Sequence, residues 1–162
     1  MKKILLILMA VFAFGLQNVC AQDGIKIVTN HPDFKVKVKR CAASDKTVII
    51  NLILNNTGFN DVEGLIAWGG SGSEAYDDEG NIYRGNNLQV SIANTQKWNS
   101  WNSDRFDIPS GVPMKLSVRL EGVPQSVESI AQLKLDIYCR AWSIGSDNKK
   151  LVKINNIPIT RD

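Results

Sequence analysis

Residues 34–40 read Phe-Lys-Val-Lys-Val-Lys-Arg, and residues 47–58 read Thr-Val-Ile-Ile-Asn-Leu-Ile-Leu-Asn-Asn-Thr-Gly. In the first stretch apolar and charged side chains alternate, and this period of two predicts a half-buried β-strand. In the second stretch apolar residues occupy both faces, which predicts a strand that is central in its sheet or buried on both sides. The closing Asn-Asn-Thr-Gly has turn chemistry and ends that strand.

The same patterns recur along the chain. Residues 75–83 predict a hairpin whose polar tip takes a positive φ at Gly80 or Asn81. Clusters of Gly, Ser, Asn, Asp and Pro separate the other predicted strands, which are 61–68, 88–93, 113–121, 133–140 and 151–159. Gly64 is expected to mark a bulge in the first of these. The spacing predicts an all-β protein, an immunoglobulin-like antiparallel β-sandwich of about seven to nine strands.

The N-terminus has the three-part layout of a secretory signal peptide. Met1-Lys2-Lys3 is basic, residues 4–16 are apolar, and small residues precede a cleavage site after Ala21. We therefore expect a signal peptide at 1–21 and a single domain at 22–162, exported to the periplasm or secreted. The mature chain has no second apolar stretch long enough to predict a transmembrane segment.

Cys20 offers an alternative to simple cleavage. A lipoprotein signal would attach lipid to a cysteine at this position and anchor the protein to a membrane. That motif has small residues directly before the cysteine, whereas Gln17, Asn18 and Val19 precede Cys20. Cleavage after Ala21 is the interpretation that the sequence favours.

Cys41 and Cys139 remain after cleavage, and an even pair in an oxidising compartment predicts one disulfide. In the chain-entropy model a closed loop of about 100 residues stabilises a fold by roughly 4.7 kcal/mol. Two free thiols are the alternative. Cys41 follows the lysine face of its strand by parity, so either the strand ends before it or a bulge turns it inward. Otherwise the disulfide would lie at a sheet edge.

Charge and motif content narrow the function classes. The formal net charge is +3, and removal of Lys2 and Lys3 leaves about +1, which gives no electrostatic case for nucleic-acid binding. The chain has one histidine, His31, for which a surface position is expected. No nucleophile elbow or phosphate-binding glycine loop occurs, and neither an enzymatic activity nor a cofactor is predicted.

Residues 77–79 form an acidic turn, Asp-Asp-Glu. Carboxylate oxygens at such a turn could bind Ca²⁺, but Gly80 comes too early for an EF-hand loop. The favoured interpretation is therefore a solvated hairpin tip. A small hydrolase that uses a pair of carboxylates is the catalytic alternative for the whole chain.

Several segments together resemble a known group of proteins. They are the strand and turn at 47–58, the hairpin at 75–83, and the block from Ile108-Pro109-Ser110-Gly111-Val112-Pro113 through Glu121-Gly122-Val123-Pro124. They look like uncharacterised secreted immunoglobulin-like domains, of unknown function, from Gram-negative gut anaerobes, over about residues 26–159. The resemblance implies export and a sandwich fold. It assigns no catalytic or binding residue.

Residues 95–105 are the most unusual segment, with Trp98 and Trp101 among amide and hydroxyl side chains. Indole rings stack on sugars or anchor protein partners, and Asn99 and Arg105 could orient a ligand. The alternative is that both indoles cover the end of the core. The resulting hypothesis is a non-catalytic binding or interaction module outside the cytoplasm, whose partner is a protein or a glycan. A structural component of the cell envelope is a further alternative.

Lys35, Lys37 and Lys39 are interpreted as a solvated strand face that discourages edge pairing.

Overall fold

A computed structural model describes residues 24–29, 32–68, 72–92, 103–139 and 149–161, with the backbone alone at 63–68, 103–106, 138–139 and 149–151. The predicted signal peptide, Cys20 and His31 lie outside these residues. The described chain forms twelve strands and a short 3₁₀ helix, η1 (Gly85–Asn87). The strands are β1 (Lys26–Thr29), β2 (Phe34–Ser44), β3 (Thr47–Asn56), β4 (Val62–Trp68), β5 (Glu74–Tyr76), β6 (Ile82–Tyr83), β7 (Leu88–Ile92), β8 (Ser103–Ile108), β9 (Met114–Glu121), β10 (Ser129–Cys139), β11 (Lys149–Pro158) and β12 (Thr160–Arg161).

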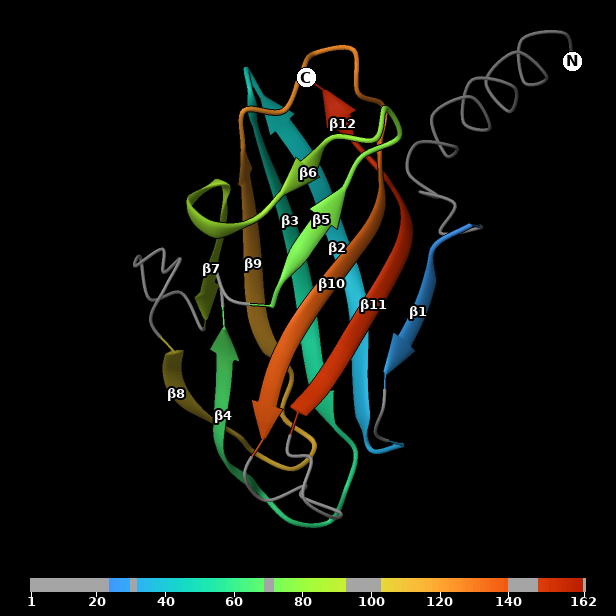
Figure 1. The fold of residues 1–162 in the computed structure, drawn as a ribbon. Helices are drawn as coiled ribbons and strands as arrows, with labels where there is room; N and C mark the ends of the chain where they lie inside the picture. Colours follow the sequence, from blue (N-terminus) through green and yellow to red (C-terminus); the bar gives the residue numbers. More distant parts are fainter. Residues whose placement is uncertain (1–23, 30–31, 69–71, 93–102, 140–148, 162) are drawn as a thin grey trace, which may run out of the picture.

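The strands form two sheets that pack face to face (Figure 1). The seven-stranded sheet has the order β1-β11-β10-β4-β8, and β5 pairs with both β10 and β6. The five-stranded sheet has the order β12-β2-β3-β9-β7. Strand pairs are antiparallel except for β12 with β2, which is parallel. The prediction of an all-β sandwich is confirmed, with more strands than the sequence indicated.

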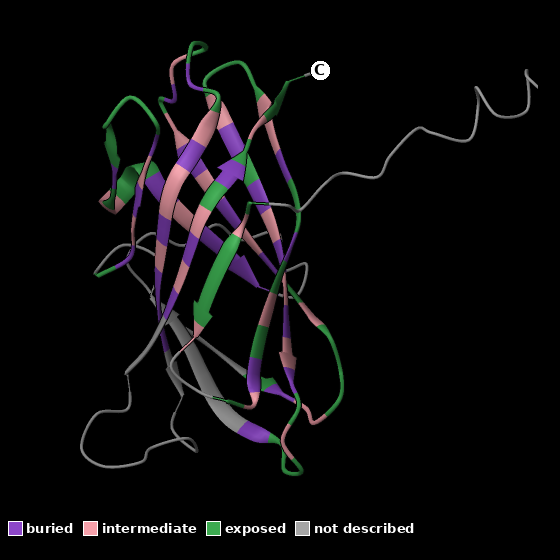
Figure 2. Cartoon of the chain, turned by 90° about the vertical axis from the view of Figure 1, so that its right-hand side faces the viewer, coloured by how far each residue is buried: buried purple, intermediate pink, exposed green. Residues whose placement is uncertain are grey.

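Inward side chains of both sheets make one core. Buried and exposed positions alternate along the strands, as Figure 2 shows by its bands of purple against pink and green. The core receives the even-numbered apolar residues of β3 and β9 and the apolar face of β10: Val48, Ile50, Leu52, Leu54, Leu116, Val118, Leu120, Leu133, Leu135 and Ile137. Full burial of one such side chain contributes about 1.5–3 kcal/mol. The period-two pattern of the sequence is therefore the pattern that builds the core.

Most predicted strands are found within one to four residues of their expected ends, and the hairpin at 75–83 is found as β5 and β6. Gly80 supplies the positive φ of its turn. β3 is central in its sheet, but Ile49 on its outer face is 36% exposed, so β3 is not buried on both sides. The sequence patterns missed β1, β8 and β12. These strands are short, and β8 overlaps a segment predicted as a loop.

A bulge in β2 resolves the position of Cys41. Val38 pairs with Leu52, but Arg40 pairs with Asn51, so Lys39 is the extra residue. The bulge turns both Lys39 and Arg40 outward and returns Cys41 to the core, where it is 5% exposed. The predicted bulge is confirmed, as is the one at Gly64, where the register between β4 and β8 shifts between Val62 and Leu65.

The predicted disulfide between Cys41 and Cys139 is not found, because Cys41 is a free thiol. Cys41 lies next to Ala42, which pairs with Thr160, at the end of the molecule where β10 begins. β10 runs over 11 residues to Cys139, which places the Cys139 backbone roughly 30 Å further along the sandwich. A disulfide needs the two Cα atoms within about 7 Å. Burial raises the pKa of the Cys41 thiol to about 12, against the smaller opposing effect of Arg161.

Candidate functional site

The predicted aromatic site lies largely outside the described residues. Trp98, Asn99 and Trp101 belong to 93–102, which joins β7 at the edge of one sheet to β8 at the edge of the other. Arg105 lies in β8, where it pairs with Ile66, and only its backbone is described. The described structure therefore does not bring these four residues together, and their role stays a prediction.

The hairpin tip is solvated at Asp78 and Glu79, as the sequence predicted, but Asp77 is buried beneath it. Asp77 is 3% exposed, which corrects the prediction for this residue. Its Oδ1 accepts hydrogen bonds from the backbone N–H groups of Glu79 and Asn81, at 3.0 and 2.8 Å. Its Oδ2 accepts from Asn81 Nδ2 at 2.9 Å and from the Tyr83 hydroxyl at 2.7 Å. The hairpin folds around this carboxylate, because a buried charge must have its oxygens satisfied.

The hydrogen bonds also shift the pKa values of Asp77 and Tyr83. Burial acts to raise the pKa of Asp77, but the bonds from Tyr83 and Asn81 outweigh it and hold that pKa below its ordinary value. Burial, followed by the hydrogen bond to Asp77, raises the pKa of Tyr83. Within the described residues no group of three or more His, Cys, Asp or Glu side chains could hold a metal ion.

The outer face of the five-stranded sheet carries the largest concentration of like charge among the described strands. Alternation along β2 and β9 turns Lys35, Lys37, Lys39, Lys115 and Arg119 outward, and the bulge adds Arg40. We call these six residues the basic face. Lys37 and Lys115 lie in one row on either side of Ile53 in β3, through the pairs Lys37–Ile53 and Ile53–Lys115.

Little on this face neutralises that charge. Among the outward side chains of the five-stranded sheet, Glu121 is the one carboxylate, and it forms an ion pair with Arg119 and accepts a hydrogen bond from Thr47. Within the described residues, Lys35, Lys37, Lys39 and Lys115 take part in no ion pair. Cross-strand neighbours two strands apart are separated by about 10 Å, which is near the Debye length at 0.1 M salt. Their potentials therefore add at low ionic strength and are increasingly screened as the salt concentration rises.

A groove of about 260 Å³ crosses the basic face. Lys39 and Lys115 line it, together with Ile53 and the polar pair Asn51 and Ser117. The Ser117 hydroxyl donates to Asn51 Oδ1 at 2.8 Å, which orients the amide. The groove thus combines positive charge, hydrogen-bonding groups and one aliphatic side chain, a combination suited to a partly apolar anionic ligand.

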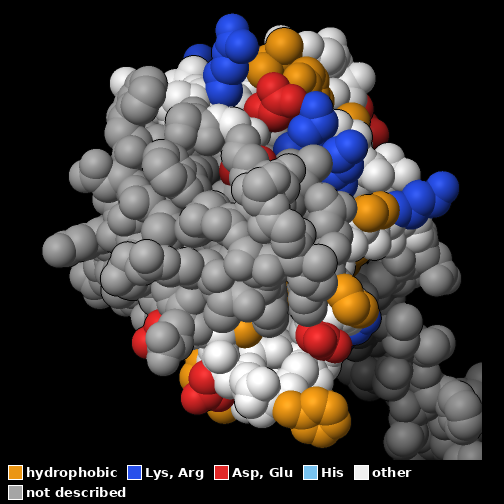
Figure 3. Space-filling view, turned by 60° about the horizontal axis from the view of Figure 1, so that its bottom comes forward, with side chains coloured by type: hydrophobic (Ala, Val, Ile, Leu, Met, Phe, Trp, Pro, Cys, Tyr) orange, Lys and Arg blue, Asp and Glu red, His pale blue; other side chains and the backbone are white. Residues whose placement is uncertain are grey.

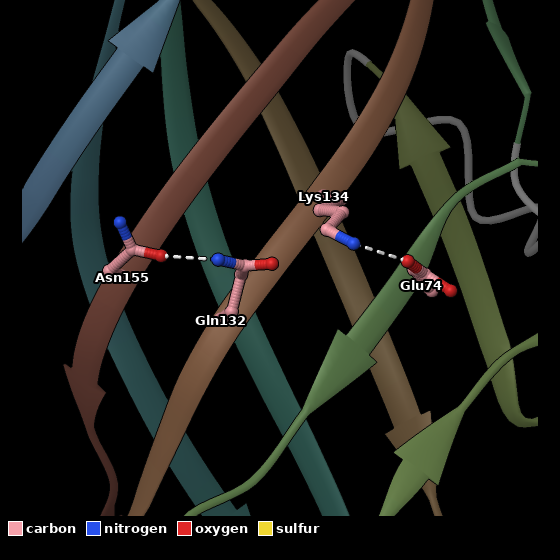
Figure 4. A network of polar contacts seen from close by, with 4 residues as sticks. All are labelled: Glu74, Gln132, Lys134 and Asn155. Atoms are coloured by element: carbon pink, nitrogen blue, oxygen red, sulfur yellow. Dashed lines mark hydrogen bonds and ion pairs between the residues drawn. The ribbon is translucent and has the colours of Figure 1, made fainter.

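The outer face of the other sheet is arranged differently. Lys134 Nζ lies 2.6 Å from Glu74 Oε1, and Gln132 Nε2 donates to Asn155 Oδ1 at 2.9 Å (Figure 4). Lys134 also lies over the Tyr76 ring, 5.1 Å from its centroid. The hydrogen bond from Lys134, with a smaller one from Tyr76, lowers the pKa of Glu74. Lys134 is therefore paired on this face, whereas its cross-strand neighbour Lys153 takes part in no ion pair among the described residues.

A second distinctive surface lies at the end of the sandwich shown at the bottom of Figure 1, where β3 joins β4. We call residues 56–61 and 108–113 the tip. The Phe59 side chain is fully exposed, at 102%, and Val112 is 50% exposed. Figure 3 looks toward this end and shows hydrophobic side chains standing among acidic and polar ones.

Buried Asn56 holds the tip together. Its Nδ2 donates to the carbonyl oxygens of Asn60 at 2.9 Å and Ile108 at 3.2 Å, and its Oδ1 accepts from the Gly58 N–H at 2.9 Å. Ser110 links the two loops, because its hydroxyl donates to the Gly58 carbonyl oxygen. Phe59 is therefore displayed from a loop whose backbone is tied on both sides.

Sequence reasoning identified the lysines of β2 but assigned them no binding role, and it missed Lys115, the groove and the tip. The signal for Lys115 is its outward position in the predicted strand 113–121. β2 and β9 lie on opposite sides of β3, so their lysines share one face of the sheet. The pattern of a single strand cannot show this arrangement. Exposure of Phe59 carries no sequence signal, because apolar residues in turns are often covered by neighbouring loops.

Comparison with known proteins does not assign this chain to a family. No protein-family model matches the sequence, and no curated protein matches it. Similar solved structures include a family 123 glycoside hydrolase from Clostridium perfringens, at 9% identity and a TM-score of 0.42, over 85% of this chain and 28% of that one. The N-terminal domain of PorA has 10% identity and a TM-score of 0.39, over 85% of this chain and 98% of that one.

A third structure is MyfA, the major subunit of Myf fimbriae from Yersinia enterocolitica, solved in complex with galactose. It has 11% identity and a TM-score of 0.34, over 82% of this chain and 98% of that one. At these identities and TM-scores the likeness carries no information on function. The resemblance to secreted domains of gut anaerobes stays a prediction.

Proposed function

We propose that this protein is a non-catalytic binding module that acts outside the cytoplasm and holds an anionic partner on its basic face. The observation that carries the proposal is the groove between Lys39 and Lys115, set in a face with six cationic side chains and one carboxylate. Opposite charge steers a partner toward such a surface, and desolvation on contact strengthens the ion pairs. Export follows from the predicted signal peptide at 1–21.

The ionisation of the described carboxylates supports a non-catalytic role. A hydrolase that uses a carboxylate pair needs one carboxyl group with a raised pKa, as general acid. The two described carboxylates with shifted pKa values, Glu74 and Asp77, are both shifted downward by hydrogen bonds. Both groups are engaged in holding strands together.

Binding to a soluble acidic polysaccharide tests the proposal. Polygalacturonate is titrated into the protein by calorimetry at 50 and 300 mM NaCl, with neutral dextran as the comparison polymer. We expect polygalacturonate to bind at 50 mM salt, dextran not to bind, and the affinity to fall as salt rises, because exposed ion pairs are screened.

Charge removal at the groove supplies the decisive variant. Replacement of Lys37, Lys39 and Lys115 by Gln should weaken binding by about 3- to 150-fold, since three exposed ion pairs at about 0.2–1 kcal/mol each sum to roughly 0.6–3 kcal/mol. The matched control replaces Lys26, Lys46 and Lys153 by Gln, which removes equal charge from other surfaces. No binding at 50 mM salt, or an equal loss in both triple variants, would contradict the proposal.

The tryptophans at 98 and 101 are proposed as an additional contact for a glycan. Titration of neutral glycans with tryptophan fluorescence as readout should show a ligand-dependent change. Trp98→Ala with Trp101→Ala should abolish the binding while leaving the affinity for polygalacturonate intact. Absence of a fluorescence change across a glycan panel counts against this contact.

A further inference from the structure

The tip is a rigid acidic surface with an apolar centre. Its residues and their neighbours include Asp33, Asp61 and Asp107, and no lysine or arginine occurs in 56–61 or 107–113. Asp61 is fixed by accepting a hydrogen bond from the Ser110 N–H at 2.7 Å, and Thr57 N–H donates to the Asp33 carbonyl oxygen at 2.8 Å. Phe59, two residues before Asp61, is fully exposed on this surface.

The rigid backbone of the tip lowers the entropy cost of binding through Phe59. A mobile loop loses backbone conformational entropy when it binds, whereas a fixed loop has already lost it. The parallel bridge between Asn56 and Ser110 and the bond from Gly111 N–H to the Asn56 carbonyl oxygen, at 2.8 Å, brace the two loops against each other. Phe59 is therefore preorganised as an anchor, and aromatic anchors dominate the affinity of protein interfaces.

The basic groove has the complementary features. It is lined by Lys39 and Lys115 and has the aliphatic side chain of Ile53 in its floor. Its volume of about 260 Å³ exceeds the roughly 150 Å³ that holds a benzene ring in an engineered protein cavity. This volume is sufficient for a phenyl ring, and the two lysines carry the charge opposite to that of Asp61 at the tip.

We propose that a second copy of this chain is the partner of the basic face, and that the tip of one copy docks in the groove of the next. The inference rests on the proposed function, because it assigns a partner to the same face. Tip and groove are different surfaces, so the contact is heterologous and leaves a free tip at one end and a free groove at the other. Such contacts propagate into open chains unless a rotation closes them into a ring.

Sedimentation velocity of the purified protein from 1 to 200 µM, at 50 and 500 mM NaCl, tests the inference. We expect the average mass to rise with concentration at 50 mM salt and to fall back at 500 mM. Phe59→Ser should weaken association at least about tenfold. Ile82→Ser is the control, because Ile82 is an exposed apolar side chain, at 50%, that lies in the hairpin at the opposite end, and it should associate as the wild type does.

Mixing two variants distinguishes this contact from others. Phe59→Ser keeps its groove and loses its tip, whereas Lys39→Glu with Lys115→Glu keeps its tip and loses its groove. Each variant alone should stay monomeric, and a one-to-one mixture should form dimers and nothing larger, since each pair can make one contact. Thermal unfolding of each variant confirms that both remain folded.

Several outcomes would overturn the inference. They are a monomeric wild type at 200 µM and 50 mM salt, unchanged association of Phe59→Ser, and a mixture that stays monomeric. Loss of binding to phosphatidylglycerol vesicles in Phe59→Ser would instead identify Phe59 as a lipid anchor. Phe59→Ser should bind polygalacturonate normally, so a monomeric protein that binds this polymer removes the inference and leaves the proposed function standing.

Discussion

At the scale of single residues, two buried polar groups show how local chemistry is decided by the surroundings. Asp77 looks from the sequence like part of a solvated acidic turn, yet four donors converge on its carboxylate. Cys41 looks like half of a disulfide, yet it is a buried free thiol. Asp77 stabilises the hairpin, and Cys41 packs in the core.

Replacement of Asp77 by Asn should destabilise the protein by about 1–3 kcal/mol at pH 7, because one carboxylate oxygen becomes an amide that faces donors. The folded-state pKa of Asp77 lies below its unfolded value. Its contribution is therefore complete above the unfolded pKa, near 4, and is lost as pH falls through the folded-state pKa. Urea unfolding between pH 7 and 3 should show a smaller acid loss in Asp77→Asn than in the wild type.

Asp45→Asn is the control for this measurement. Asp45 is exposed in the turn between β2 and β3 with φ of 51°, a conformation that Asn accepts. We expect its effect to stay within about 0.5 kcal/mol. Equal acid dependence in Asp77→Asn and the wild type would show that the carboxylate is not linked to folding.

The Cys41 thiol should not react with iodoacetamide in the native protein at pH 8. Its pKa of about 12 leaves almost no thiolate, and the side chain is buried. Without any reductant, guanidinium should expose it to full alkylation, which peptide mass spectrometry quantifies. Recovery of a Cys41–Cys139 disulfide peptide would contradict the free thiol.

At the scale of elements, the β2 bulge reconciles two requirements of one strand. Phe34, Val36 and Val38 need one register, and Cys41 needs the other. The extra residue, Lys39, supplies the change and adds a cation to the basic face. A bulge of this kind re-aims side chains without ending the strand.

Deletion of Lys39 should therefore be tolerated, with a loss of about 1 kcal/mol or less, because Val38 and Arg40 would then pair with consecutive residues of β3. Deletion of Lys37 is the control and should cost more than about 3 kcal/mol, since it turns Phe34 and Val36 outward. Denaturant midpoints of both variants test the difference. Similar losses in the two deletions would show that the bulge does not set the register.

At the scale of the whole molecule, the two sheets share one core, so the protein should unfold in one cooperative step. Far-UV circular dichroism and tryptophan fluorescence should give coincident urea transitions. Leu52→Ala, at a fully buried position between the sheets, should lower stability by about 2–5 kcal/mol. The matched control Ile49→Ala, on the outer face of the same strand, should lower it by less than half as much. Separate transitions would indicate independently stable sheets.

Much of the fold could be predicted from alternation alone. Apolar residues at every second position predicted the strands β2, β3, β9 and β10 and their inward faces. This works because successive side chains of a strand point to opposite faces of the sheet. The short strands β1, β8 and β12 escaped, because two to six residues with few apolar positions carry little pattern. The candidate site was hardly predicted, since it depends on which strands become neighbours.

The sequence by itself determined the β class, the parity of the core, and the turns at Asn56 and Gly80. These are local properties that follow from backbone geometry and side-chain polarity within a few residues. Tertiary structure alone decided that Lys115 faces Lys37 across Ile53, that Cys41 and Cys139 lie at opposite ends, and that Phe59 is left uncovered. Strand order and loop packing join residues far apart in the chain, and no local pattern records which segments meet.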